Sequence, residues 1–350
     1  MSHASLRGFV TAISVACLVP AAATGQDRAQ GSEKTWTLPR TPDGQPDLQG
    51  YWTTQTFTPL ERPEYVAGKE FFTEEETAAL QEQLTAEGVN PVARSAINFE
   101  DAEARETRLR QTQENIHYDN AIWLRTSVPK GLSSRRTSLI TDPPNGQIPP
   151  LTPRGAAQVA ADQAERQQRP SNFESYETRP LMERCIVWTH EGPPMLPPAY
   201  NDIHQIFQTP DYVVVFTELG ANAPRIIPLD GRPHIPDRIR QFPGDSRGHW
   251  EGEKLVVETT NFVDRRSYRG STGFRHVVER FTRVGADTIR YEFTIDDPTT
   301  WTSSWSGEIP MVKTEGPMFE YGCHEGNHDI RHILEINRNL EKQTADAARR

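Results

Sequence analysis

Hydrophobic and polar residues alternate through the second half of the chain, beginning near Cys185. A period of two is typical of strands that bury one face, as in antiparallel sheets. The clearest runs are DYVVVFTEL, EKLVVETTNF, HVVERFTRV and DTIRYEFTI. The pattern predicts strands at about 184–189, 203–208, 211–218, 224–229, 248–250, 254–260, 275–283, 287–295 and 318–323. Many short strands at this spacing predict an antiparallel β-barrel or β-sandwich domain over residues 181–340.

Residues 26–180 have a different pattern, rich in proline and only thinly apolar. Thr73 is followed three residues later by Glu76, and this capping box predicts a helix with Leu80 and Leu84 on one face. The remaining elements expected here are a strand at about 50–57, a charged helix at 101–115, two short strands between 138 and 148, and a helix at 155–168. A segment with so few apolar residues does not build its own core, so we expect an arm wrapped around the β domain.

The end of the chain predicts a helix at about 329–340 followed by a disordered tail at 341–350. The predicted fold class is therefore mainly β, α+β overall, with a partly helical N-terminal arm and a C-terminal helix.

The first 25 residues have the layout of a secretory signal peptide. Arg7 precedes an apolar run from Phe9 to Ala23, and small residues then lead into a polar stretch. The run is shorter than the ~20 residues that a membrane-spanning helix needs. We therefore expect residues 1–25 to be removed and the mature protein to be periplasmic or extracellular.

Charge and missing motifs narrow the function classes. The net charge is −10, so the basic stripe on which nucleic-acid binding relies is missing. No later stretch is apolar enough to span a membrane, so we expect a soluble protein. The sequence has no Walker A, G-x-G-x-x-G or C-x-x-C-H motif, which argues against a nucleotide site and c-type haem.

Removal of Cys17 with the signal would leave Cys185 and Cys323 as a pair. In an oxidising compartment such a pair is expected to form a disulfide, with buried free thiols as the alternative.

The residues after Cys323 read His324-Glu325-Gly326-Asn327-His328, an H-E-x-x-H pattern. On a helix, His324 and His328 would share a face and could bind zinc, with Glu325 as the base. Gly326 and Asn327 are poor helix residues, so the alternative is a turn into the last helix. Zinc is therefore a possible cofactor, and no other cofactor is expected.

Further polar residues are spread along the predicted strands, and barrel strands direct alternate residues inward. The wider set is Glu183, Arg184, His190, Asn201, Asp202, His204, Glu218, Asp230, Arg232, His234, Arg247, His249, Glu251, Glu279, Arg280 and Glu325. The preferred catalytic candidates are His249, Glu251, His324 and Glu325, because a carboxylate beside a histidine can act as an acid/base pair. The preferred ligand-binding candidates are His204, Arg247, Trp250 and Tyr291. The alternative for each residue is a turn hydrogen bond or a surface ion pair.

Several segments together resemble an uncharacterised family of exported bacterial proteins. They are TPDGQPDLQG, SLITDPPNGQIPPLTPRG, ERCIVW, EGPPMLPPAYND, RIIPLDGRPH, GDSRGHWEGEKLVVETTNF and YGCHEGNHDI. The resemblance covers most of the chain after the signal and implies export, but it implies no chemistry. Separately, Gly50-x-Trp52 on the first predicted strand is similar to the lipocalin (calycin) G-x-W motif.

Three functions remain open from the sequence. The favoured hypothesis is a barrel that binds a small, partly apolar or aromatic ligand, since Trp188, Trp250, Trp301, Trp305 and Phe281 would line a cavity. The second is a hydrolase, lyase or isomerase that uses a His/carboxylate pair or zinc. The third is an envelope protein whose arm wraps a partner. The oligomeric state is left open.

Overall fold

The computed structural model describes residues 36–86, 89–90, 93, 96–99, 101–110, 130–168, 173–188, 190–198, 203–220, 224–264, 269–271 and 273–349. Residues Leu38–Arg350 form one compact unit. The signal peptide predicted for residues 1–25 lies outside the described residues.

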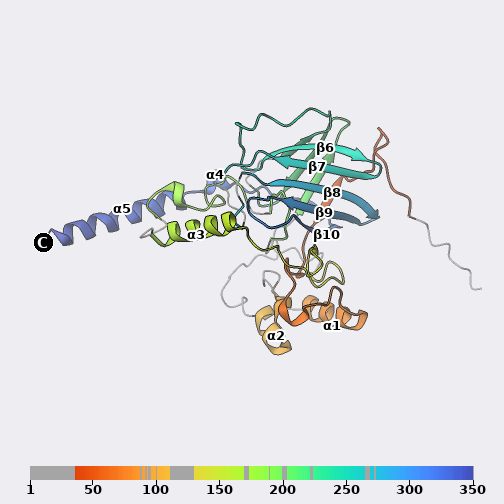
Figure 1. The fold of residues 1–350 in the computed structure, drawn as a ribbon, viewed down its shortest axis with the longest axis horizontal. Helices are drawn as coiled ribbons and strands as arrows, with labels where there is room; N and C mark the ends of the chain where they lie inside the picture. The colour runs from red at the N-terminus through yellow and green to blue at the C-terminus, as the bar shows by residue number, and fades with distance from the viewer. Residues whose placement is uncertain are drawn as a thin grey trace, which may run out of the picture. The chain divides into compact units, whose positions relative to one another are not determined.

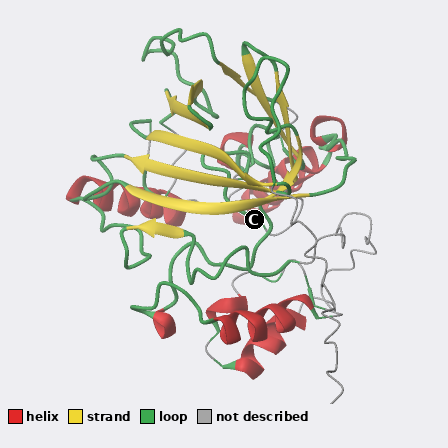
Figure 2. Cartoon of the chain, turned by 90° about the vertical axis from the view of Figure 1, so that its right-hand side faces the viewer, coloured by secondary structure: helices red, strands yellow, loops and turns green. Residues whose placement is uncertain are grey.

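A single antiparallel sheet dominates this unit and forms a nearly closed barrel (Figures 1 and 2). Its strands are β1 Gly50–Thr53, β2 Ile140–Asp142, β3 Ile203–Gln208, β4 Tyr212–Thr217, β5 Arg225–Pro228, β6 Asp245–Glu251, β7 Lys254–Thr260, β8 His276–Gly285, β9 Thr288–Asp296 and β10 Trp305–Lys313. The hydrogen-bonded order is β5-β4-β3-β1-β10-β9-β8-β7-β6, and β2 pairs with β10. The predicted fold class is confirmed.

The two ends of this order, β5 and β6, meet through side chains. The Arg225 Nε on β5 donates a hydrogen bond to the Ser246 Oγ on β6 at 3.0 Å. Gly248 allows the close approach, because a Cβ at that position would lie 2.8 Å from the Cγ2 of Ile227. The seam therefore needs a residue without a side chain on β6.

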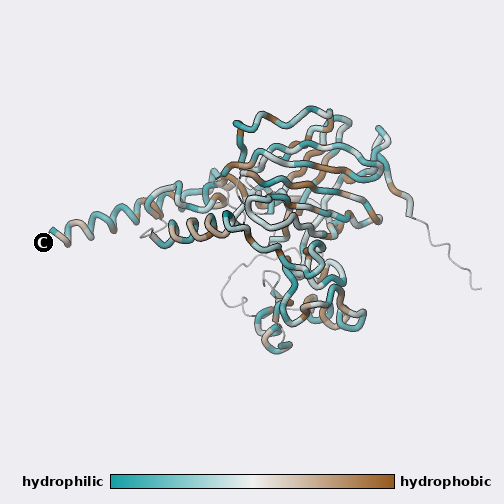
Figure 3. The backbone as a smooth tube through the Cα atoms, in the orientation of Figure 1, coloured by the Kyte–Doolittle hydropathy of each residue, from teal (hydrophilic) through white to brown (hydrophobic). Residues whose placement is uncertain are grey.

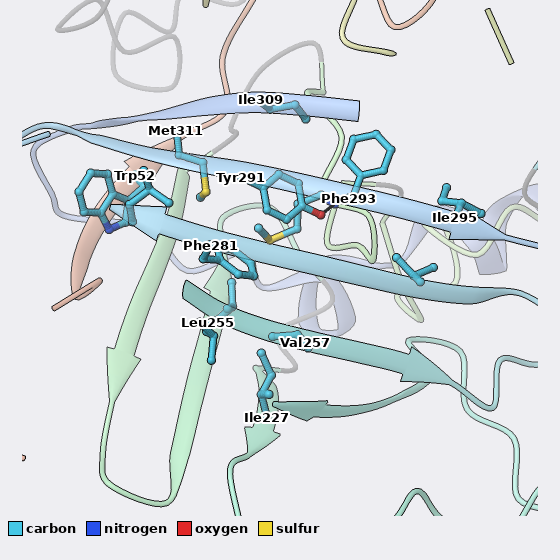
Figure 4. Close-up of a cluster of buried hydrophobic side chains, with 14 of the residues drawn as sticks. Trp52, Ile227, Leu255, Val257, Phe281, Tyr291, Phe293, Ile295, Ile309 and Met311 are labelled. Atoms are coloured by element: carbon cyan, nitrogen blue, oxygen red, sulfur yellow. Dashed lines mark hydrogen bonds between the residues drawn. The ribbon is translucent and has the colours of Figure 1, made fainter. Parts of the chain in front are cut away.

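Alternate residues of each strand fill the barrel interior, as the period of two predicts. Figure 4 shows Leu255, Phe281, Tyr291 and Ile227 from four strands meeting inside the sheet, and Figure 3 shows hydrophobic stretches concentrated in the strands. Phe281 and Phe293 flank Tyr291 with ring centroids 5.0 and 6.0 Å away. The interior is thus a packed core in which aromatic rings lie among aliphatic side chains.

One end of the interior is closed by the chain that enters β1. The Trp52 indole is fully buried, and its Nε1 donates to the Leu48 carbonyl at 2.8 Å. The Arg283 guanidinium lies 5.4 Å from the Trp52 ring, and its NH1 donates to the Asp47 carbonyl at 2.6 Å. We call this the Trp52 end.

The helices are α1 Glu74–Thr85, α2 Ala102–Arg110, α3 Pro153–Gln168, α4 Cys323–Gly326 and α5 Asp329–Ala348, with 3-10 turns at Glu64–Val66, Ala96–Asn98 and Tyr176–Thr178. The predicted capping box of α1 is present, with both the Thr73 and the Glu76 bonds formed. Leu80 and Leu84 are buried in a small cluster of their own with Ile97 and Leu109. Figures 1 and 2 show α1 and α2 together, away from the strands. Residues 26–180 also supply two strands of the sheet, β1 and β2.

Three predicted strands are wrong, and one strand was not predicted. Of the two short strands expected between 138 and 148, only β2 forms, and residues 147–148 belong to no strand. Residues 184–188 form turns, because Cys185 adopts a φ of 55° as the chain bends toward Cys323. Residues 318–323 have no strand pairing, and Cys323 begins α4. The missed strand, β10, contains Pro310, which lacks an N–H donor. Here β10 pairs with β2 at residues 306–307 and with β1 at residues 312–313, so Pro310 lies between the two partners.

The C-terminal helix is longer than expected. The sequence predicted an end near Leu340 and a disordered tail at 341–350, but α5 runs to Ala348. Hydrogen bonds and ion pairs within the helix, such as that from Arg338 to Glu341, support the added turns. Among the described residues, no helix is both long and apolar enough to cross a membrane.

Candidate functional site

Polar side chains from seven neighbouring strands face the barrel interior. We call this set the polar band. Its members, in order from β3 to β9, are His204, Thr217, Arg225, Ser246, Thr259, Glu279 and Tyr291. The strand registers place them close together: His204 is opposite Thr217, and Ser246 is opposite Thr259. Polar groups gathered within an apolar interior are the usual means of orienting a small molecule.

An ion pair between Arg225 and Glu279 lies at the centre of the polar band. The Arg225 NH1 donates to the Glu279 Oε1 at 2.9 Å, and its NH2 contacts Oε2. The same guanidinium donates to Ser246 and Thr259, each at 3.0 Å. Burial would lower the pKa of Arg225, but the charge and hydrogen bonds of Glu279 raise it above its usual value. The two charges therefore balance each other inside the barrel.

Tyr291 extends this network. Its hydroxyl donates to the Glu279 Oε1 at 2.8 Å and accepts a hydrogen bond from the Met195 backbone N–H at 2.9 Å. Burial, followed by the nearby charge of Glu279, raises the pKa of Tyr291 well above its usual value. The phenol is therefore neutral and keeps its proton on the side of Glu279.

Residues 190–198, which we call the cap segment, pack against the polar band. Its residue Met195 is fully buried among the core side chains. The segment contains Pro193, Pro194, Pro197 and Pro198, which have no N–H to donate. Its contacts with the barrel include the Met195–Tyr291 bond and a bond between the His190 Nε2 and the Glu218 carbonyl at 2.9 Å.

Two histidines are buried here, His190 in the cap segment and His204 on β3. The His204 Nδ1 is 3.0 Å from the Thr217 Oγ1, and its Nε2 is 3.4 Å from the Thr54 Oγ1. Burial, with a smaller contribution from His190, lowers the pKa of His204 to about 3. Burial also lowers the pKa of His190, although its bond to Glu218 opposes this. Both imidazoles are therefore neutral at neutral pH.

Three of the four ligand-binding candidates face the barrel interior, and the fourth lies on its outer face. His204 and Tyr291 face the interior, and Trp250 packs partly buried against the core. Arg247 lies on the outer face of β6, where its NH2 pairs with Asp245 at 3.1 Å and its Nε donates to the Pro233 carbonyl. Because side chains alternate along β6, Ser246, Gly248 and Trp250 face inward and Arg247 does not.

The catalytic candidates lie in two separate places. The exposed pair of His249 and Glu251 is on the outer face of β6, with the His249 Nε2 3.1 Å from the Glu251 Oε1. His324 and Glu325 are exposed on the single turn of α4. The barrel sheet therefore does not bring these pairs together.

The zinc candidates are not on one helix. The four-residue α4 ends at Gly326, and His328 is the N-cap residue of α5, so the i, i+4 face of an H-E-x-x-H helix is not formed. In the described part of the chain, no group of three or more His, Cys, Asp or Glu side chains is arranged to hold a metal ion.

The predicted disulfide between Cys185 and Cys323 is confirmed, with the two Cα atoms 5.8 Å apart. It joins the chain just before the cap segment to α4. Asn327 strengthens the junction by donating to the Glu183 carbonyl at 2.7 Å, and the Trp188 ring lies edge-on to Tyr321 with centroids 5.7 Å apart.

Arg225, Met195 and Thr259 were not among the sequence candidates. Arg225 carried a usable signal, because it is two residues before Ile227 and must share its face if RIIP is a strand. Met195 carried none, since its burial depends on where a proline-rich segment crosses the sheet.

A separate hollow of about 410 Å³ lies beside α2, lined by Phe99, Asp101, Glu103, Ala104, Thr107 and Arg108. It is widely open, and the acidic side chains along it are exposed. The polar band is the better candidate, because its charged groups are buried and converge.

No protein-family model, curated protein or solved structure matches the chain.

Proposed function

We propose that the protein is an exported binding protein that holds a small, partly apolar or aromatic molecule inside the barrel, beneath the cap segment. The observation that carries this proposal is the network of Arg225, Glu279 and Tyr291 within an otherwise apolar interior. Replacing a buried ion pair by well-packed apolar residues is often neutral or stabilising, so stability alone does not explain such a pair. A role in orienting a ligand does explain it.

The cap segment is the part of the barrel that a ligand would displace. Met195 is fully buried in the same core cluster as Tyr291, and a ligand that takes its place must offset the re-exposure of this side chain, about 1.5–3 kcal/mol. That cost lowers the apparent affinity by roughly 10- to 150-fold. The aromatic rings of Phe281, Tyr291 and Phe293 supply apolar surface that can offset it.

A thermal-shift screen with fatty acids, terpenoids, steroids and phenolics tests the proposal. Any hit is then titrated against Met195→Ala, which keeps the backbone N–H but shortens the side chain over Tyr291. We expect Met195→Ala to bind the hit about tenfold or more tightly, because less side chain has to be displaced. The matched control is Met311→Ala, which truncates an equally buried methionine on β10.

The proposal fails if no compound in the screen stabilises the protein. It also fails if Met195→Ala and Met311→Ala change affinity equally, since binding would then respond to core loosening and not to the cap segment.

Export is part of the same proposal. The signal-peptide layout of residues 1–25 and the resemblance to exported bacterial proteins both support it. N-terminal sequencing of the protein from the periplasm or medium should begin within a few residues after Ala23. An intact Met1 in the cytoplasm would rule out export.

A further inference from the structure

We infer that the ligand is a neutral molecule that donates a hydrogen bond to the Tyr291 hydroxyl, such as an alcohol, a phenol or an amide, and that the site discriminates against carboxylates. This inference rests on the proposed function and adds the chemical class of the ligand. It follows from the hydrogen bonds that Tyr291, Glu279 and Arg225 already make.

The first step is the single proton of Tyr291. A tyrosine hydroxyl has one donor and can also accept. Its donor is used by the Glu279 Oε1 at 2.8 Å, a charge-assisted bond that is stronger than one to a neutral group. Only the accepting side of the hydroxyl is left for another partner. In the structure, the Met195 backbone N–H takes that place at 2.9 Å.

Movement of the cap segment would take the Met195 N–H away from Tyr291. The Tyr291 oxygen would then have no hydrogen-bond donor, although the oxygen itself would stay buried inside the barrel. An unpaired buried acceptor is costly, so a ligand that supplies an O–H or N–H at this position is favoured over one that does not. The expected preference for a donor over a matched ether is about 5- to 150-fold.

The third step excludes an anionic ligand. Arg225 uses all but one of its N–H groups on Glu279, Ser246 and Thr259. Its charge is matched by Glu279 and is not available to a second carboxylate. A ligand carboxylate beside Tyr291 would instead lie near the negative Glu279 and would find no donor on the tyrosine.

The test uses three probes of similar size, 4-ethylphenol, 4-ethylanisole and 4-ethylbenzoate, titrated into the full mature protein by NMR at neutral pH. The phenol can donate, the anisole cannot, and the benzoate is negatively charged. We expect the phenol to bind about 5- to 150-fold more tightly than the anisole and the benzoate to bind most weakly.

A Tyr291→Phe variant then tests whether the preference for the phenol arises at the Tyr291 hydroxyl. It removes the accepting oxygen, so the ratio of phenol to anisole affinity should fall to about one, a change that general destabilisation would not produce. The comparison of the three probes with the wild-type protein stands even if this variant does not fold.

The outcomes separate the two proposals. Equal binding of phenol and anisole, or tightest binding of the benzoate, overturns the donor inference and leaves the binding function in place. A phenol preference that persists in Tyr291→Phe also overturns it. If none of the three binds to wild type or to Met195→Ala, the proposed pocket for aromatic ligands fails, and the inference fails with it.

Discussion

Acidification should destabilise the protein through His204. The folded state lowers the pKa of this imidazole from 6.5 to about 3, because the ring is fully buried between Thr217 and Thr54. In the unfolded chain it titrates near its usual pKa of about 6.5. Below that pH the unfolded state binds more protons than the folded state, so the free energy of unfolding falls as the pH falls.

The size of the effect follows from the two pKa values. Stability is unaffected well above pH 6.5 and is lost progressively down to about pH 3, where the folded state also takes up the proton. Between pH 7 and pH 5, His204 alone should cost about 2 kcal/mol. His190, whose pKa is also lowered by burial, should add a loss of the same sign.

Urea unfolding at pH 7 and pH 5 measures this directly. His204→Asn keeps a polar group beside Thr217 but does not titrate, so its free energy of unfolding should depend on pH by about 2 kcal/mol less than that of wild type. The matched control is His249→Gln, which removes a histidine exposed on the outer face of β6. If His204→Asn keeps the full pH dependence, then His204 does not stay neutral in the folded protein.

Three further predictions concern the barrel and its closure. Glu279→Leu should lower the free energy of unfolding, measured in urea, by about 3–5 kcal/mol, because it leaves the Arg225 charge unpaired. Adding Arg225→Met should recover most of this loss. A double variant as unstable as the single one would contradict the prediction. Reduction of the disulfide, which spans 138 residues, should cost about 5 kcal/mol and lower Tm, whereas no change in Tm would show that the packing alone holds the junction. In native-state hydrogen exchange, the Met195 N–H should exchange through local opening and the Trp52 indole N–H only with global unfolding, and equal protection would argue against a movable cap segment.

Sequence reasoning succeeded where one local rule decides the structure. Alternating residues in RYEFTI fix which side chains of β9 face inward, and one face is clearly apolar. The α1 capping box needs only Thr73 and Glu76, which lie in one turn. The disulfide followed from the cysteine pair expected after export, and the predicted compartment favoured its oxidation.

Sequence reasoning was insufficient where the orientation or pairing of a strand depends on residues far away in the sequence. Both faces of β6 carry polar residues, so its sequence alone does not show that Ser246 and Gly248 face inward and Arg247 and His249 outward. That choice is made by Ile227 on β5, which packs against Gly248 across the seam. Similarly, Pro310 argues against a central strand, and only the gap between β1 and β2 makes β10 acceptable there.

The residues that close the Trp52 end and the residues of the cap segment are held in different ways. At the Trp52 end, the closing residue is part of β1, which is hydrogen-bonded to β3 on one side and β10 on the other. Opening that end would break the sheet. Met195, by contrast, belongs to a proline-rich segment outside the strands, and the disulfide holds the chain just before it. Its bond to Tyr291 lies outside the strand pairing, so the cap segment can move without loss of the barrel. Under the proposed function, the cap segment is therefore where we expect a ligand to enter.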